Sequence, residues 1–294
     1  QRPLPGRNGT SGHVASPQFS LGLTTRLSAS SGCLWHPQLK SCDGRARAGL
    51  LSVDPCKVVS GELIQMSLYS DSKYPVREDL GAIHEKQLAQ LADPGTWGNS
   101  QQRLAIAAEA RQAGYDAGVL EKPDDAGAPP EIDLPDVAKK VVRELAANPK
   151  DFLEENFNDA KAGGLSDEEY TEIVGIVSRV TDMDVFARGI GVPLRPLPAP
   201  GPGEPSRERP DAAIQELAFI PTVPNPPEGL PKPYIMRGLS LVPDEMRLHI
   251  ELEQVQYLPA GKIMDPVFEH HEGFARAQAE IVAGRVSALN ECFY

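Results

Sequence analysis

A proline-rich segment divides this chain into two parts. Residues 191–233 contain 13 of the 28 prolines, including the run PLPAPGP at 196–202. Proline has no backbone N–H and fixes φ near −65°, so such a segment cannot continue a helix and favours extended polyproline geometry. We therefore expect residues 191–235 to be a linker between two helical parts, 66–190 and 236–294. A ligand for proline-binding domains is the less favoured interpretation.

The part before the linker has the periodicity of helices. Its clearest helix begins at Ser166, where Glu169 completes a capping box, and runs toward Gly189 with apolar residues three or four apart. No stretch of the chain combines strand alternation with hairpin turns, so the predicted fold class is all-α. Further helices are expected over 76–91, 101–117, 134–147 and 149–160 before the linker, and over 239–257 and 269–289 after it.

Residues 1–65 differ in composition from the rest of the chain. They precede the first methionine, Met66, and contain seven basic and three acidic residues, whereas the whole chain has a net charge of −12. They lack sustained periodicity, so we expect them to stay outside the fold, as upstream sequence or as a disordered tail or propeptide. Three of the four cysteines, Cys33, Cys42 and Cys56, lie here without metal-ligand spacing, which supports neither a disulfide framework nor a zinc site.

The overall charge excludes some classes of partner. With 41 acidic against 29 basic residues, the chain is not expected to bind nucleic acid or an anionic membrane. No run approaches the roughly 20 apolar residues that span a bilayer, and no signal-peptide core is present near residue 1, so we expect a cytoplasmic protein.

Few motifs point to a cofactor or a metal. The chain has no phosphate-binding loop, nucleophile elbow or dinucleotide fingerprint, so no cofactor is expected. The run Glu269-His270-His271-Glu272 could suggest a metal site, but neighbouring residues on a helix point about 100° apart. His84 and His249 are expected to be ordinary core or surface histidines.

The end of the sequence carries the most specific motif. Glu280 is followed by eleven residues and then by Cys292, Phe293 and Tyr294. This spacing resembles the alkylhydroperoxidase D and carboxymuconolactone decarboxylase family, whose motif is a glutamate, eleven residues and then Cys-x-x-Cys-x-x-x-His. The resemblance covers about residues 70–294. It extends to blocks typical of a two-repeat subgroup at 94–97, 165–170 and 203–207.

The resemblance implies a fold of two alkylhydroperoxidase-like helical repeats, the second truncated at the redox motif. It also implies reduction of a hydroperoxide at the expense of an unidentified thiol donor. Because the helices that should cover the apolar faces of the truncated second repeat are missing, we expect exposed apolar patches and a homo-oligomer. Cys292 would be the resolving thiol and Glu280 a general base acting through a relay. The copy before the linker has Leu104, Asp116 and Val119 at the motif positions, so it is expected to be non-catalytic.

The motif is incomplete in this sequence, so we expect the chain as written to be inactive. The position after Tyr294 is where the family has its second redox residue. We expect selenocysteine, encoded by a recoded UGA, at that position, with a fragment as the alternative.

Helix geometry limits how Glu280 and Cys292 can meet. On one straight helix they would lie about 18 Å apart along the axis, so the helix must end near Leu289, and Asn290 could cap a following helix. Cys292 would then lie in a first turn, where free amides favour the thiolate.

Other interpretations of the motif stay open. Glu280 could be a solvated glutamate paired with Arg276, and Cys292 an inert buried thiol. At the level of the whole chain, the alternatives are a non-catalytic scaffold or oligomerisation module and a cofactor-free lactone decarboxylase.

Overall fold

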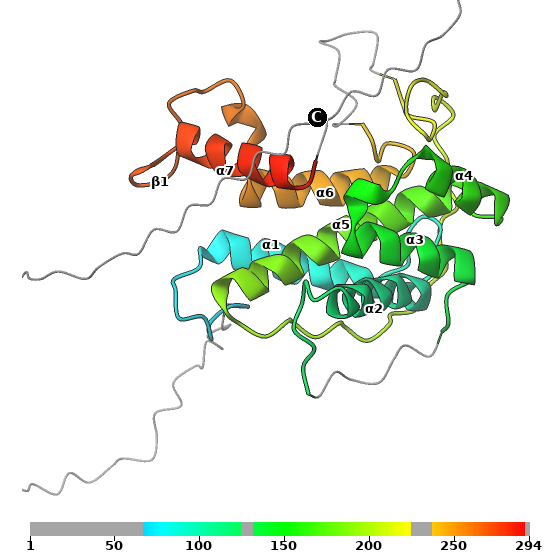
Figure 1. The fold of residues 1–294 in the computed structure, drawn as a ribbon, viewed down its shortest axis with the longest axis horizontal. Coiled ribbons are helices and arrows are strands. Elements are labelled where there is room, and N and C mark those ends of the chain that lie inside the picture. Colours follow the sequence, from blue (N-terminus) through cyan, green and yellow to red (C-terminus); the bar gives the residue numbers. More distant parts are fainter. Residues whose placement is uncertain (1–66, 125–131, 225–236, 292–294) are drawn as a thin grey trace, which may run out of the picture. The chain divides into compact units, whose positions relative to one another are not determined.

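The computed structural model describes residues 67–124, 132–224 and 237–291, and these ranges are predominantly helical (Figure 1). Within them the predicted all-α class is confirmed at this level, with one small two-stranded hairpin as the departure. The elements are α1 (Glu78–Ala89), η1 (Gln90–Ala92), α2 (Ser100–Asp116), α3 (Asp136–Ala147), η2 (Pro149–Asp151), α4 (Glu154–Ala162), α5 (Asp167–Ile190), α6 (Pro243–Gln256), η4 (Ala260–Lys262), β1 (Glu269–His271), β2 (Phe274–Ala275) and α7 (Arg276–Leu289).

Side-chain caps set the start of the two longest helices. Ser166 Oγ accepts the backbone N–H of Glu169 at 3.1 Å, and the Glu169 carboxylate accepts the backbone N–H of Ser166 at 3.0 Å. This reciprocal pair is the predicted capping box of α5. Asn99 and Gln102 form the same arrangement at the start of α2. Local sequence therefore determines where both helices begin.

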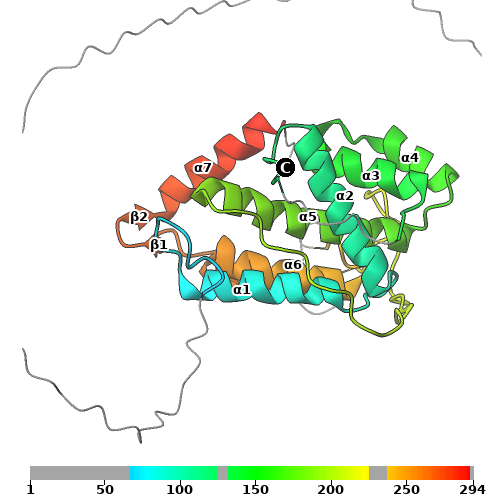
Figure 2. The same cartoon turned by 90° about the horizontal axis from the view of Figure 1, so that it is seen from below.

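The core forms around α5. This helix packs against α2, α3 and α6, and α1 lies alongside α6 (Figure 2). Because α6 follows the proline-rich segment and yet packs against α1 and α5, both helical parts of the sequence contribute to one packed unit. The most deeply buried apolar side chains of this core are Leu91, Ala107, Val141, Val142, Ile176, Val180 and Leu241.

The proline-rich segment lies along this unit. From Pro193 to Pro210 it contains neither helix nor strand, as expected. The backbone N–H of Gly201 donates to Ala92 O, and that of Arg207 donates to Thr96 O, each at 2.8 Å. These bonds hold the segment against the turn between α1 and α2. Three of the features predicted from sequence, residues 1–65, linker residues 225–235 and Cys292, lie outside the described residues.

The predicted helix over 269–289 is wrong at its start. Glu269–His271 and Phe274–Ala275 instead pair as antiparallel strands, and the helix α7 begins at Arg276. Gly273 has φ of +77°, which favours glycine and allows the tight turn between the strands. The aromatic rings of the hairpin pack on each other around His270.

Two other predicted boundaries also shift. The segment predicted as one helix over 149–160 is a 3₁₀ turn followed by α4, and α6 begins at Pro243 rather than at 239. Proline suits the first turn of a helix, where its missing N–H would have no partner.

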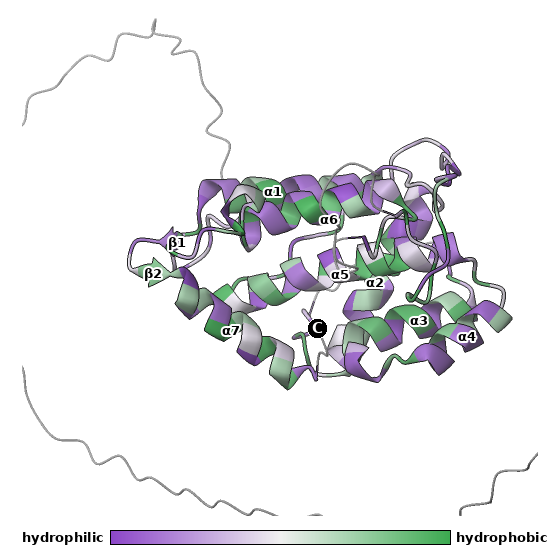
Figure 3. Ribbon diagram, turned by 90° about the horizontal axis from the view of Figure 1, so that it is seen from above, coloured by the Kyte–Doolittle hydropathy of each residue, from purple (hydrophilic) through white to green (hydrophobic). Residues whose placement is uncertain are grey.

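The last helix is exposed along its length. No residue of α7 is buried, and the ribbon of α7 in Figure 3 carries both hydrophobic and hydrophilic residues. The large apolar side chains that face solvent on α7 are Ile281, Val282, Val286 and Leu289. By contrast, Leu248 and Leu252 of α6 are buried, so the apolar face of α6 is covered and that of α7 is not. In the described ranges, no helix combines the length and the apolarity that a bilayer crossing requires.

Candidate functional site

Glu280 lies in the middle of α7 and has two polar partners. Its Oε2 accepts the Tyr257 hydroxyl at 3.0 Å, and its Oε1 accepts Arg276 Nε at 3.1 Å. The Tyr257 hydroxyl and, next, Arg276 lower the pKa of Glu280, so this carboxyl is ionised at neutral pH. The ion pair with Arg276 is the one expected if Glu280 is a solvated glutamate of the helix surface. The Tyr257 contact, from the end of α6, is an additional partner that sequence spacing did not indicate.

The end of α7 matches the geometric requirement derived from the motif. The helix stops at Leu289, and the backbone N–H groups of Asn290 and Glu291 close its last turn by donating to Val286 O and Ala288 O. Glu291 also pairs with Lys150 at 3.0 Å. Asn290 therefore caps the carboxyl end of α7. Cys292 lies outside the described residues, so the structure does not bring it together with Glu280.

A pocket of 330 Å³ lies between α5 and α6. Tyr257 lines it and also binds Glu280, which connects the pocket to the predicted catalytic glutamate. The residues lining the pocket are Ser178, Arg179, Asp182, His249, Leu252, Glu253, Gln256 and Tyr257.

A chain of hydrogen bonds reaches this pocket from α1. The Tyr69 hydroxyl and His84 Nδ1 lie 2.6 Å apart, and His84 Nε2 and Gln256 Oε1 lie 2.5 Å apart. Gln256 Nε2 then donates to Asp182 Oδ1 at 2.9 Å. His84 is fully buried, and burial lowers its pKa, so it is a core histidine as predicted. Burial raises the pKa of Asp182 to about 6.

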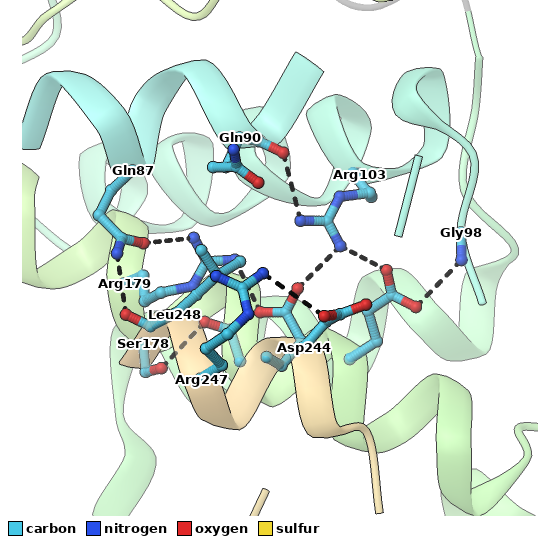
Figure 4. Close-up of polar contacts among 12 residues, drawn as sticks. Gln87, Gln90, Gly98, Arg103, Ser178, Arg179, Asp244, Arg247 and Leu248 are labelled. Carbon is cyan, nitrogen blue, oxygen red and sulfur yellow. Dashed lines mark hydrogen bonds and ion pairs between the residues drawn. The ribbon is translucent and has the colours of Figure 1, made fainter. Parts of the chain in front are cut away.

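A buried ionic network joins α5 to α6 beside the pocket, which Arg179 of the network also lines (Figure 4). Arg179 donates to Glu245 Oε2 at 2.7 Å and to Gln87 Oε1 at 2.8 Å. Arg103 donates to Glu245 Oε1 at 2.8 Å and to Glu172 Oε1 at 2.5 Å. Two arginines and two glutamates thus neutralise one another in the interior, and we refer to Arg103, Glu172, Arg179 and Glu245 as the ionic network.

The two glutamates of the network differ in electrostatic environment. Burial acts to raise the pKa of Glu245, but Arg179 and Arg103 together outweigh it, so the pKa falls below its usual range. Among the described residues Glu172 pairs with one cation, Arg103, and burial raises the pKa of Glu172. Glu172 Oε2 also accepts the backbone N–H groups of Trp97 and Gly98 at 2.6 and 3.0 Å.

Figure 4 shows two further contacts that surround the network. Gln87 Nε2 donates to Leu248 O at 2.8 Å, which joins α1 to α6. On the outer side of α6, Arg247 pairs with Asp244 at 3.4 Å. The buried contacts therefore join α1, α2, α5 and α6 at one point.

Sequence reasoning missed the ionic network and the residues of the pocket. A signal was present in α5, because Glu172, Ile176 and Arg179 are spaced four and three apart and so share one helix face. Two charged residues on an apolar face indicate a buried ion pair. The two do not pair with each other: Glu172 pairs with Arg103, and Arg179 pairs with Glu245, which is 66 positions away and which no local pattern identifies. In the described part of the chain, no group of three or more His, Cys, Asp or Glu side chains could hold a metal ion.

Comparison of this chain with protein-family models, with curated proteins and with solved structures finds no match.

Proposed function

We propose that this chain belongs to a thiol-dependent peroxide reductase of the alkylhydroperoxidase type, with Cys292 as a redox thiol and Glu280 as the proton acceptor. The observation that carries the proposal is the spacing of Glu280 and Cys292 across the end of α7 at Leu289. A chain that turns after Leu289 can return toward the helix, whereas a continued helix would keep the two residues about 18 Å apart.

The proposed chemistry uses two redox residues, of which Cys292 is the resolving one. A thiolate or selenolate attacks the outer oxygen of the hydroperoxide, the O–O bond breaks, and the alcohol leaves with a proton. The attacking residue is left as a sulfenic or selenenic acid. The Cys292 thiolate attacks this group, water leaves, and an S–S or S–Se bond forms, which an external dithiol reduces by exchange.

Glu280 has a charge state suited to this role. Its contacts with Tyr257 and Arg276 keep it ionised at neutral pH, so it can accept a proton from a thiol that approaches it. A thiol with a pKa near 8.5 is only a few per cent ionised at pH 7, so transfer of its proton to Glu280 during the attack can accelerate the reaction by at least about tenfold.

The experiment compares the four cysteines of one chain. The protein is exposed to limiting cumene hydroperoxide, and oxidation of each cysteine is followed by isotope-coded alkylation and mass spectrometry. We expect Cys292 to oxidise about tenfold faster than Cys33, Cys42 and Cys56, because the proposal gives a proton acceptor, Glu280, to Cys292 alone among these four thiols, and direct oxidation of Cys292 does not require the attacking redox residue. Equal rates at the four cysteines would refute the proposal.

Two variants separate the role of Glu280 from a general effect of charge. Glu280→Gln should slow the oxidation of Cys292, whereas Glu272→Gln, which changes an exposed glutamate of the hairpin, should not. If both variants behave like the wild type, Glu280 is not the proton acceptor.

A helical oligomerisation module is the second candidate function. It is favoured by α7, which buries none of its residues and exposes four large apolar side chains. Exposed apolar surface of this kind promotes association. Sedimentation velocity over a range of concentrations should show self-association, and Val282→Ser with Val286→Ser should reduce it. A monomer at all concentrations would exclude this function.

A further inference from the structure

The pocket between α5 and α6 contains a carboxylate, Asp182, that has no counter-ion among the described residues. The three most deeply buried carboxylates of the described residues, Glu172, Asp184 and Glu245, each contact an arginine. Asp182, in the same helix as two of them, accepts a hydrogen bond from Gln256 but forms no ion pair with any described residue. Asp182 is half-buried, yet it lacks the arginine partner that each of the other three carboxylates has.

The arginine in the pocket does not supply that charge. Arg179 lines the pocket three residues before Asp182, but its two terminal nitrogens donate to Gln87 and to Glu245. Glu253 adds a second carboxylate at the exposed edge of the pocket. With Arg179 neutralised by Glu245, the charge facing the pocket is negative.

Other lining groups complete a set of hydrogen-bond acceptors. Burial lowers the pKa of His249, so its ring is neutral at pH 7. Its Nδ1 atom is buried and has no hydrogen-bond partner among the described residues. Leu252 and the Tyr257 ring provide apolar surface in the same pocket. The lining therefore combines two carboxylates with apolar groups.

We propose that this pocket binds a small organic ammonium ion, whose N–H groups donate to Asp182 and Glu253 and whose apolar part lies against Leu252 and Tyr257. An ammonium nitrogen has up to three donors and no acceptor, which matches a lining of carboxylates and a neutral imidazole. The volume of 330 Å³ is in the range of small-molecule sites. This binding activity does not depend on the proposed redox role of Cys292.

A divalent metal fits the pocket less well. Asp182, His249 and Glu253 are residue types that bind metals, yet no group of three such side chains among the described residues is close enough to hold one. An organic cation distributes its hydrogen bonds and apolar contacts over a larger volume, so it does not need three ligands within coordination distance.

The experiment uses n-butylammonium chloride as the probe. It is titrated into the full chain near neutral pH at constant ionic strength, and binding is followed by ligand-observed NMR. We expect saturable binding of n-butylammonium and none of n-butanol, its neutral analogue. Asp182→Asn should weaken binding about tenfold or more, as expected for the loss of a charged acceptor, whereas Asp211→Asn, at an exposed loop position, should leave it unchanged.

Two results would overturn the proposal. One is the absence of saturable binding of n-butylammonium to the wild-type chain, and the other is equal affinity of the wild type and Asp182→Asn. Circular dichroism provides the fold control, and Asp182→Asn should keep its fold because asparagine retains the Oδ1 atom that accepts Gln256.

The pH dependence gives an independent readout. Affinity of the wild type should decrease below about pH 6, where Asp182 takes up a proton, and Asp182→Asn should lack this decrease. The other titratable or charged groups that line the pocket or lie near Asp182 and its partner Gln256 are Arg179, His249, Glu253, Tyr257, His84 and Tyr69, and both proteins share them. A difference between the two pH profiles therefore reports on Asp182.

Discussion

Replacing Glu245 by glutamine tests whether the ionic network holds the helices together. The carboxylate is fully buried and accepts Arg103 at 2.8 Å and Arg179 at 2.7 Å. In Glu245→Gln the amide nitrogen, a donor, would face one of these two donors. Arg103 would keep Glu172 as a charged partner, whereas Arg179 would lose its ion pair. Breaking a buried ion pair from one side costs about 3–5 kcal/mol, because an uncompensated charge stays in the interior.

The assay is thermal and urea unfolding followed by circular dichroism. For a domain of this size each kcal/mol lowers the Tm by about 2–4 °C, so we expect a decrease of about 6–20 °C. The matched control is Glu251→Gln, on the same helix. Glu251 pairs with Lys86 and Arg247 at 2.7 and 3.0 Å but is partly exposed, so its loss should cost about 1 kcal/mol or less.

A double variant separates charge from packing. The double variant Glu245→Leu with Arg179→Met removes one negative and one positive charge together, and the ion pair between Arg103 and Glu172 stays. This variant should be more stable than Glu245→Gln, because apolar replacement of a buried pair is often neutral or stabilising. If Glu245→Gln loses no more stability than Glu251→Gln, the network does not hold the helices together and the reasoning fails.

Three further predictions concern stability measured in the same way. An alanine Cβ at Gly175 would meet Glu245 Oε2 at 2.6 Å, so Gly175→Ala should lower the free energy of unfolding by about 1–3 kcal/mol. At Gly189 an added Cβ would have no atom within 4 Å, so Gly189→Ala should raise the free energy of unfolding by about 0.5–1 kcal/mol. The raised pKa of Asp182 means that the folded state binds this proton more tightly than the unfolded state, so stability is lost as the pH rises from about 4 through 6. Asp182→Asn should therefore be about 1–2 kcal/mol more stable than the wild type near pH 7.5 and equal near pH 4 in urea titrations. Removal of residues 1–65 should leave helix content and Tm unchanged, and a decrease of several degrees would show that these residues stabilise the fold.

Where a helix boundary depends on residues close in sequence, the sequence predicted it. The capping box of Ser166 and Glu169 and the end of α7 at Leu289 follow from interactions within a few residues. The hairpin at 269–275 was missed because its sequence also fits a helix, and the choice depends on the Gly273 turn and on aromatic packing around His270. Short strands of this kind depend on contacts that periodicity does not record.

Tertiary pairing explains why the contacts of Glu280 and the ionic network were not predicted. The spacing of Glu280 and Cys292 is local and could be recognised, whereas the contact of Glu280 with Tyr257 joins residues 23 apart on different elements. The contact of Arg103 with Glu245 spans 142 residues. Neither partner can be identified from one sequence without knowledge of the packing.

Arg179 is the residue through which the ionic network and the pocket depend on each other. It lines the pocket, and it lies one helical turn from Asp182, at a spacing where opposite charges on a helix commonly pair. The pair does not form, because Glu245 from α6 and Gln87 from α1 take both terminal nitrogens of the guanidinium group. The packing of α6 and α1 on α5 thus both neutralises the buried arginine and leaves Asp182 without a counter-ion. The charge of the pocket is therefore a consequence of how these three helices pack, and any change that releases Arg179 from Glu245 would let it neutralise Asp182 and compete with a cationic ligand.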